Sequence, residues 1–198
     1  MRLMELSKIQ SGYISRGRIE PQREGSYYLL QAKDVDGDRL SYRTDALIRF
    51  DPVMSRNDWL LKSGDVLFMA RGSRNYSVLL GEIQDSILAA ACFFIIRVTE
   101  EIVLPGYLCW HLNQIPVMRY LMRHSGRGVS MPVVTRSVLE SIDVPVPPME
   151  IQKKIIGMDA LITAEQELLN SLATKRREFI SGVCLQAVKE ISQQRKMI

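Results

Sequence analysis

The stretch Pro147-Pro148-Met149-Glu150-Ile151-Gln152-Lys153-Lys154-Ile155-Ile156 opens the most regular pattern in the sequence. From Ile151 onward, apolar residues recur at alternating steps of four and three, which is the spacing of a heptad repeat in a coiled-coil helix. Eight of the ten positions in this series are apolar, and the exceptions are Glu165 and Arg176. We call these ten positions the seam: Ile151, Ile155, Met158, Ile162, Glu165, Leu169, Leu172, Arg176, Phe179 and Val183.

The prolines set where this helix begins. Proline is tolerated just before a helix or in its first turn, and it breaks a helix interior. No proline follows Pro148. At about 1.5 Å per residue, roughly forty residues form a rod on the order of 60 Å long. We find no second long helix to cover it, so we expect the seam to pack against another chain. The sequence thus predicts a domain over residues 1–147 and a helix for dimerisation and subunit assembly over residues 148–198.

Composition limits the class of protein. With 198 residues, the chain can hold one fair-sized core and an appendage. The longest uncharged apolar run, 87–96, is too short to span a membrane, and the N-terminus lacks the apolar core of a signal peptide. We therefore expect a cytoplasmic protein without a membrane partner. Its three cysteines, with no paired metal-ligand spacing, predict buried free thiols and no structural zinc.

Arginine dominates the cations of the N-terminal part. Residues 1–150 hold 15 arginines and three lysines, balanced by 17 acidic residues. The planar fork of arginine suits phosphates and the edges of guanine. GC-rich coding produces the same bias, so composition alone leaves a nucleic-acid partner open.

Two basic loops are candidate DNA contacts. Residues 60–70 read as a turn entering a buried strand, and 78–80 as the next strand, which places 71–76 at a hairpin tip. Its polar residues could reach base edges and phosphates, although a solvated tip has the same composition. The second loop, 123–130, holds two glycines that would let backbone amides approach a phosphate. The candidates are Arg71, Arg74, Asn75, Tyr76, Arg123, Arg127 and Ser130, with Arg16, Arg18 and Lys33 as weaker ones.

The remaining segments predict an α+β fold with a mixed or antiparallel sheet. The apolar run 87–98 is typical of a buried strand. Helices are expected from Pro105 and again from Pro116, and Ser137-Val138-Leu139-Glu140 is a capping box for a short helix. Residues 142–146 read as an edge strand. The aspartates of 34–38 suggest calcium, but the later ligands of a calcium loop are missing, so a turn is the better interpretation.

Several catalytic patterns are absent from the sequence. It contains no P-loop, no glycine-rich dinucleotide motif after a strand, no acidic-x-Lys element and no Asn/Asp-Pro-Pro-aromatic motif. The only histidines, His111 and His124, lie in or at the end of predicted helices, where a structural role is the simpler interpretation. The sequence therefore indicates a recognition or assembly component without catalytic residues, metal or cofactor.

Taken together, the motifs resemble the specificity (S) subunit of type I restriction–modification systems, in a short form with a single target-recognition domain. Three stretches carry the resemblance. They are Leu61-Lys62-Ser63-Gly64-Asp65-Val66-Leu67-Phe68 with its arginine loop, Pro105-Gly106-Tyr107-Leu108-Cys109-Trp110-His111-Leu112, and Leu139 to Ile155 with its Pro-Pro pair and Glu150-x-Gln152. The last is the most specific, because it looks like the family's junction between a strand and the conserved helix.

The resemblance implies a division of labour. In full-length S subunits, two recognition domains each read half of a bipartite target, and long antiparallel helices separate them. A modification subunit methylates adenine, and a restriction subunit cleaves. With one domain and one helix, this chain is expected to homodimerise, to bind double-stranded DNA at a gapped palindrome, and to direct those partners. Contact between Glu165 of one copy and Arg176 of the other would fix an antiparallel register.

Two alternatives remain open at this point. The chain could be a half-subunit that pairs with a different S chain, or modulates another system, without reading DNA independently. It could also be a detached recognition domain that acts on an enzyme's catalytic chain and has no DNA affinity of its own.

Overall fold

The computed structural model describes residues 1–15, 17–38, 40–53, 59–125 and 133–194. By its internal contacts the chain divides into two compact units, Met1–Ile156 and Gly157–Ile198. Among the described residues, the strands and the short helices lie in the first unit, and the second unit up to Gln194 is the continuation of one long helix. We describe each unit separately.

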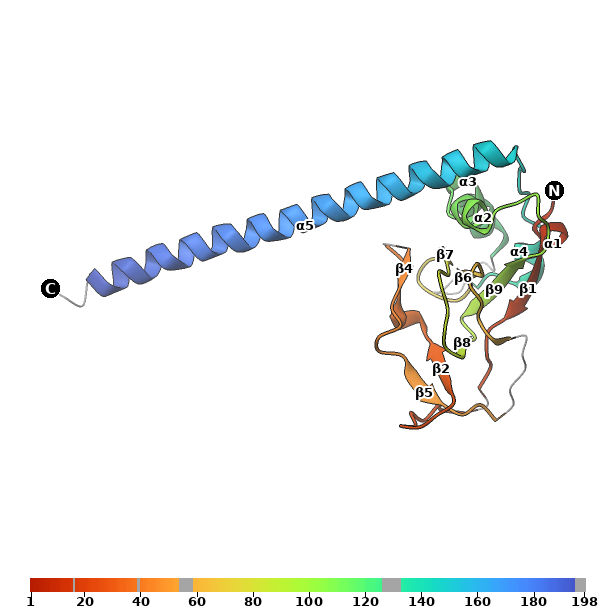
Figure 1. Ribbon diagram of the computed structural model, residues 1–198, viewed down its shortest axis with the longest axis horizontal. Coiled ribbons are helices and arrows are strands. Elements are labelled where there is room, and N and C mark those ends of the chain that lie inside the picture. The colour runs from red at the N-terminus through yellow and green to blue at the C-terminus, as the bar shows by residue number, and fades with distance from the viewer. Residues whose placement is uncertain (16, 39, 54–58, 126–132, 195–198) are drawn as a thin grey trace. The chain divides into compact units, whose positions relative to one another are not determined.

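A four-stranded antiparallel sheet forms the centre of the first unit (Figure 1). The chain enters it through a one-turn helix, α1 (Leu3–Leu6). The strand order is β1-β9-β6-β7, with β1 at Ser7–Ser11, β9 at Phe93–Val98, β6 at Val66–Met69 and β7 at Ser77–Leu79. The strands β6 and β7 form the predicted hairpin, with Val66 opposite Leu79.

A second sheet of three strands is mixed. Its order is β5-β2-β8, with β5 at Ile48–Phe50, β2 at Tyr27–Leu30 and β8 at Ile87–Ala89. The pair β2–β5 is antiparallel, and β2–β8 is parallel. Between β2 and β5 lie a 3-10 turn, η1 (Ala32–Asp34), and a small hairpin of β3 (Val35–Asp36) and β4 (Ser41–Tyr42).

The prediction of one strand over 87–98 is wrong. The chain turns at residues 90–92, where the Phe93 amide donates to the Ala90 carbonyl at 3.0 Å. As a result, β8 and β9 belong to different sheets. A turn made of two alanines and a cysteine has no glycine, proline or polar residue to mark it, so the apolar run hides it.

Alternate residues of the central sheet face two different cores. Val66, Phe68 and Ile96 pack in one cluster with residues of α1, α2 and α3. Leu67, Ile95 and others of the opposite face pack in a second cluster with residues of β2 and β8. The two-residue period of a strand therefore places helices on one face and the second sheet on the other. This arrangement confirms the predicted α+β class.

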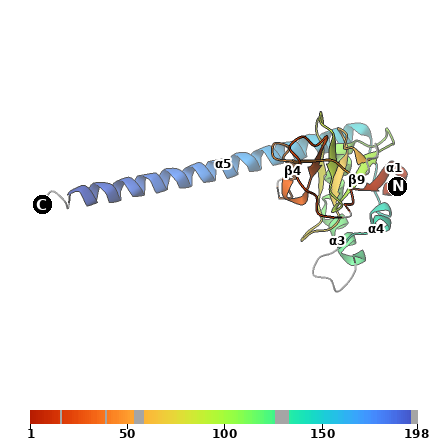
Figure 2. The same ribbon diagram turned by 90° about the horizontal axis from the view of Figure 1, so that it is seen from below.

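The helices begin where their prolines predict. α2 (Pro105–Leu112) and α3 (Ile115–His124) each carry proline in the first turn. α4 (Arg136–Glu140) begins earlier than the predicted capping box, because the Thr135 side chain caps it by accepting from the Val138 amide. α3 and α4 lie side by side, joined by the Tyr120 and Ser141 hydroxyls at 2.8 Å (Figure 2).

Residues 142–146 do not form the expected edge strand. The chain is extended there but makes only an isolated bridge, between Arg2 and Asp143. The Leu3 amide donates to the Ile142 carbonyl and the Val144 amide to the Met1 carbonyl, at 2.9 and 2.8 Å. The segment thus joins the N-terminus to the start of the long helix.

A turn at Gly64-Asp65 fixes the entry to β6. Gly64 has φ +86°, a left-handed conformation that glycine adopts without strain. Asp65 is 1% exposed and forms an ion pair with Arg97 of β9, with Nη2–Oδ2 at 2.6 Å and Nε–Oδ1 at 2.7 Å. The Lys62 amide also donates a hydrogen bond to Asp65 Oδ2, at 2.8 Å. The 61–68 stretch that carries part of the resemblance therefore has a structural role here.

The long helix α5 (Met149–Gln194) begins inside the first unit. Gln152 is fully buried in its first turns, and its amide accepts from the Leu104 amide and donates to the Ile102 and Pro147 carbonyls, each at 2.8 Å. Ile155 and Ile156 pack against the helix-side core. This buried glutamine anchors the helix start on the domain.

In the second unit, the seam is uncovered. Met158, Leu172 and Phe179 are 64%, 63% and 72% exposed. Leu161 and Leu168 beside the seam are each 72% exposed. Exposed apolar residues at heptad spacing are typical of a helix that packs against a partner.

The three cysteines are free, but only Cys109 is buried. Cys92 is partly exposed and Cys184 is exposed on α5. The prediction of a buried thiol is wrong for Cys184, because its apolar neighbours on the helix are themselves exposed. Within the described residues, no helix is both long and apolar enough to cross a membrane.

Candidate nucleic-acid interface

The β6–β7 loop, residues 70–76, is held in place by its own polar groups. The Ala70 and Arg71 amides both donate to the Cys92 carbonyl, at 2.9 and 3.3 Å. The Asn75 side-chain amide donates to the Met69 carbonyl at 2.8 Å, and the Met69 amide donates to the Tyr76 carbonyl at 2.9 Å. The loop is therefore fixed on both sides of Arg74, which is 52% exposed.

Other segments converge on this loop. Val133, which follows the predicted second basic loop, pairs with Arg71, and the Val134 amide donates to the Ala70 carbonyl at 3.0 Å. Ala32 lies beside the Cys92 thiol, so the exposed Lys33 that follows it is close to this end of the sheet. Burial raises the pKa of the Cys92 thiol, which disfavours the reactive thiolate form.

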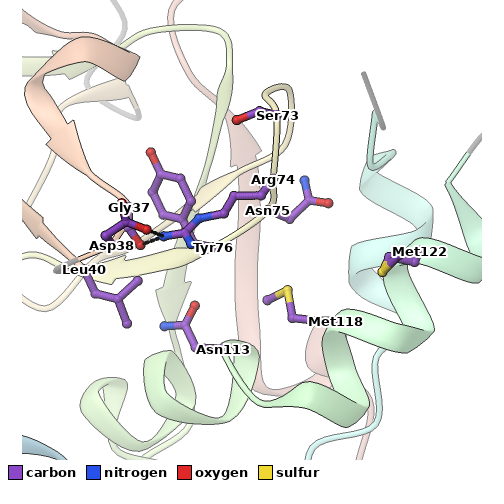
Figure 3. Close-up of a pocket in the computed structure, with 10 residues that line it drawn as sticks. All are labelled: Gly37, Asp38, Leu40, Ser73, Arg74, Asn75, Tyr76, Asn113, Met118 and Met122. Carbon is purple, nitrogen blue, oxygen red and sulfur yellow. Dashed lines mark hydrogen bonds and ion pairs between the residues drawn. The ribbon is translucent and has the colours of Figure 1, made fainter. Parts of the chain in front are cut away.

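A cavity of about 550 Å³ lies between this loop, the β3–β4 turn and α3 (Figure 3). Its lining combines polar residues of the two turns with methionines of α3. The lining residues are Gly37, Asp38, Leu40, Ser73, Arg74, Asn75, Tyr76, Asn113, Met118 and Met122. Because Met122 precedes Arg123, the helix end that carries Arg123 borders the same surface.

The predicted contact residues do not all have the same exposure. Arg71, Arg74, Arg123 and Lys33 are exposed, and Asn75 is partly buried because its amide holds the loop. Tyr76 is only 9% exposed, and its ring packs in the sheet-side core. Four of the predicted cationic contacts are therefore exposed to solvent.

Three predicted contacts, Arg16, Arg127 and Ser130, lie outside the described residues. Arg18 is exposed, but its neighbour Ile19 packs with a third core cluster around Tyr13 and Phe50. No contact of the described residues links Arg18 to the β6–β7 loop. The structure thus brings together the hairpin loop, Lys33 and Arg123, and leaves Arg18 apart.

Two features of this surface escaped the sequence analysis. Arg119 lies one helical turn before Arg123 on α3, and both are exposed. The i, i+4 spacing of two arginines was a signal that could have found it. The second feature is the turn at Gly37-Asp38, whose carbonyl and carboxylate both contact the Arg74 Nη2 group.

The histidines have structural positions. His111 Nε2 lies 3.0 Å from the Asp143 carbonyl, and burial lowers the pKa of its imidazole. His124 Nδ1 lies 2.8 Å from the Tyr120 carbonyl, and its ring contacts that of Tyr120 in a tilted arrangement, with the ring centres 4.2 Å apart. Among the described residues, no group of three or more His, Cys, Asp or Glu side chains has the arrangement of a metal site.

The sequence matches the family described as "Type I restriction modification DNA specificity domain" over residues 1–174. The chain belongs to this family. Membership confirms the resemblance drawn from the sequence, and it places the chain with the DNA-recognition component of these systems and not with a catalytic one. A comparison with curated proteins gave no significant match.

Solved structures of the same family share the fold. The HsdS subunit from Thermoanaerobacter tengcongensis is 22% identical, with a TM-score of 0.65 over 90% of this chain and 45% of that chain. The S subunit from M. genitalium is 14% identical, with a TM-score of 0.56 over 90% and 42%. A chain of a structure titled for "complex assembly" and "conformational transition of the type I R-M system" is 17% identical, with a TM-score of 0.60 over 85% and 38%. The chain spans less than half of the length of each.

Proposed function

We propose that this chain is a half-sized DNA-recognition subunit that homodimerises through α5, reads a gapped palindromic target, and directs adenine methylation and cleavage by partner subunits. The observation that carries the proposal is the uncovered seam of α5, attached to a domain of the DNA specificity family. A monomer would leave that apolar face in water.

The DNA surface in this proposal is the end of the domain around the β6–β7 loop. Arg71, Arg74, Arg123 and Lys33 are exposed there, and Arg119 extends the same patch along α3. Arginines on a rigid loop suit base edges, and cations along a helix suit phosphates. We assign Asn75 and Tyr76 to holding the loop, because their side chains face the protein.

The seam supports one particular antiparallel register. If Glu165 of one copy meets Arg176 of the other, the same register sets Leu169 against Leu172. Continuing outward, it sets Ile162 against Phe179 and Met158 against Val183. Every core layer between Met158 and Val183 then contains two seam positions, and the two charged layers, related by the two-fold axis, each contain opposite charges. The first two seam positions, Ile151 and Ile155, fall outside these layers, and Ile155 packs against the core of its own domain. The proposed domain of residues 1–147 would stand at each end of the paired 148–198 helices.

Partner subunits would use the apolar surface that the dimer leaves uncovered. Leu161, Leu168 and Ile180 flank the seam and are 72%, 72% and 53% exposed. An antiparallel pair needs mainly the seam, so these flanking residues remain for helices of a modification subunit. A two-fold dimer would present two identical recognition surfaces, and its target would be an inverted repeat with a fixed gap.

Sizing by light scattering and a charge-reversal series test the dimer. We expect the purified chain to be a dimer, Glu165→Arg and Arg176→Glu to weaken it separately, and the double reversal to restore it. Gln166→Arg is a matched control, because it adds a charge next to the seam. A monomer at tens of micromolar, or a double reversal that fails to rescue, would contradict the proposed register or the dimer itself.

Selection of bound duplexes from a randomised pool tests DNA reading. We expect an inverted repeat with a constant gap, and loss of base preference when both Arg71 and Arg74 are replaced by alanine. Intact preference in that variant would contradict the assignment of the loop. A chain that is monomeric alone and binds DNA only with a different S chain would support the half-subunit alternative.

A further inference from the structure

The turn at residues 36–38 is built against the proposed DNA-reading loop. Arg74 Nη2 contacts the Gly37 carbonyl and lies 2.8 Å from Asp38 Oδ1, and its guanidinium carbon lies 5.8 Å from the centre of the Tyr76 ring (Figure 3). A single arginine thus connects two hairpins that are distant in the sequence. The Asp38 carboxylate is 87% exposed, on the surface from which DNA would approach.

The turn holds its position independently of this ion pair. The Asp38 amide donates to Asp36 Oδ1 at 2.9 Å, which closes the turn. The Gly81 amide donates to the Tyr42 hydroxyl at 2.9 Å, which ties β4 to the segment after β7. A side chain at Gly37 would meet the Tyr76 ring at 2.6 Å, so the turn lies directly on this buried ring. Asp38 therefore has a fixed place before Arg74 reaches it.

A free arginine on a DNA-binding surface pairs readily with phosphates, because that contact needs no particular sequence. An aspartate beside the arginine changes whether the guanidinium contacts a phosphate or a base. The carboxylate repels phosphates, holds the guanidinium through Nη2, and leaves Nη1 to donate to an acceptor on a base. Guanine presents two acceptors, N7 and O6, in the major groove and is the base that arginine most often reads.

We propose that Asp38 is a positioning residue for base reading: it holds Arg74 in place and keeps its guanidinium away from the phosphates, so that Arg74 contacts a guanine of the target. The inference rests on the proposed function, since it assigns a role within the DNA surface described above. It gives the 36–38 turn, which the sequence marks only as a turn, a part in specificity.

The test compares the base preference of full-length variants on a randomised duplex pool. Asp38→Asn removes the charge and keeps the shape, and Arg74→Ala removes the reader. Asp143→Asn is the matched control, because Asp143 is also an exposed carboxylate that pairs with an arginine, Arg2, at 3.4 Å. The melting temperature of each variant reports any loss of folding.

We expect Asp38→Asn to relax the preference at one guanine by roughly 5- to 100-fold, at the position that Arg74→Ala also relaxes. The double variant should match Arg74→Ala alone, because Asp38 acts through Arg74. Binding of Asp38→Asn to unrelated duplex should stay equal or increase, since a negative charge has been removed. The control should keep the wild-type preference.

Three outcomes would overturn the inference. One is a wild-type preference in Asp38→Asn while Arg74→Ala loses a position. Another is a uniform loss over all sequences with a lowered melting temperature, which indicates a structural role only. The third is relaxation at different positions by the two variants. Absence of any sequence preference in the wild-type dimer would instead reject the proposed function, and the inference with it.

Discussion

Asp65 is a residue whose role the fold explains in full. Its carboxylate is buried, pairs with Arg97 and accepts from the Lys62 amide. Removing one partner of a buried pair leaves the other charge without compensation. We expect Asp65→Ala to lower the free energy of unfolding by about 3 kcal/mol, measured by urea denaturation at fixed protein concentration.

Asp85→Ala serves as the control for this variant, because Asp85 is exposed. Its effect should stay within about 0.5 kcal/mol, as for most surface substitutions. Equal effects of the two substitutions would contradict the structural role of the Asp65–Arg97 pair.

The buried imidazole of His111 should make the stability of the fold depend on pH. Burial lowers the pKa of its imidazole below the ordinary 6.5, so the unfolded chain takes up the proton first. Stability should therefore fall as the pH drops below about 6.5, since the unfolded state binds more protons. Thermal unfolding between pH 7 and 5.5 should show this decline, and His111→Gln should reduce it. An identical decline in the variant would assign the pH dependence to other groups.

At the residue scale, the sequence predicted that residues 71–76 form a hairpin tip, but it did not predict which of their side chains face the protein. Tyr76 and Asn75 look like DNA contacts because they lie between arginines in a polar tip. Their burial depends on Gly37, which covers the Tyr76 ring, and on the Met69 carbonyl, which takes the Asn75 amide. The first of these partners is too distant in the chain for a local pattern to reveal it.

At the scale of elements, α5 is the part that the sequence predicted best. A heptad series and a Pro-Pro pair are local signals, and the helix begins at Met149 as they indicate. The division of 87–98 between two sheets was missed, because the partners of β8 and β9 decide it. Those partners are β2 for β8 and both β1 and β6 for β9, and β2 and β1 lie more than fifty residues earlier in the sequence.

The anchor of α5 should be sensitive to substitution. Gln152→Ala would leave the Leu104 amide and the Ile102 and Pro147 carbonyls without their buried partner. We expect a loss of about 2–4 kcal/mol in the free energy of unfolding. Gln166→Ala, which removes an exposed glutamine of the same helix, should change it by less than about 0.5 kcal/mol. A tolerated Gln152→Ala would mean that packing of Ile155 and Ile156 anchors the helix by itself.

Replacing Gly157 should stabilise the protein, whereas replacing Gln152 should destabilise it. It lies inside α5, and a side chain added there would meet nothing within 4 Å. Alanine favours a helix interior over glycine by about 1 kcal/mol. Gly157→Ala should therefore raise the unfolding midpoint and the helix content measured by circular dichroism. A lower midpoint would show that the glycine is needed for close contact with a partner helix.

For the whole molecule, the central proposal is that two identical domains read one symmetric target. The proposed DNA-reading loop lies in the first unit, and eight of the ten seam positions, from Met158 to Val183, lie in the second, so each can be changed without removing the other. Substitutions in the loop should alter which bases are read. Substitutions in the seam should abolish reading of the paired half-sites while each domain remains folded.

The most direct measurement is the adenine-methylation pattern of the host genome with this gene intact and deleted. The proposal predicts that deletion removes methylation at one gapped motif, and that the motif is palindromic. Loss of a gapped but asymmetric motif would contradict the homodimer and indicate pairing with a different recognition chain. An unchanged pattern of adenine methylation would contradict the claim that this chain directs a methyltransferase in its host.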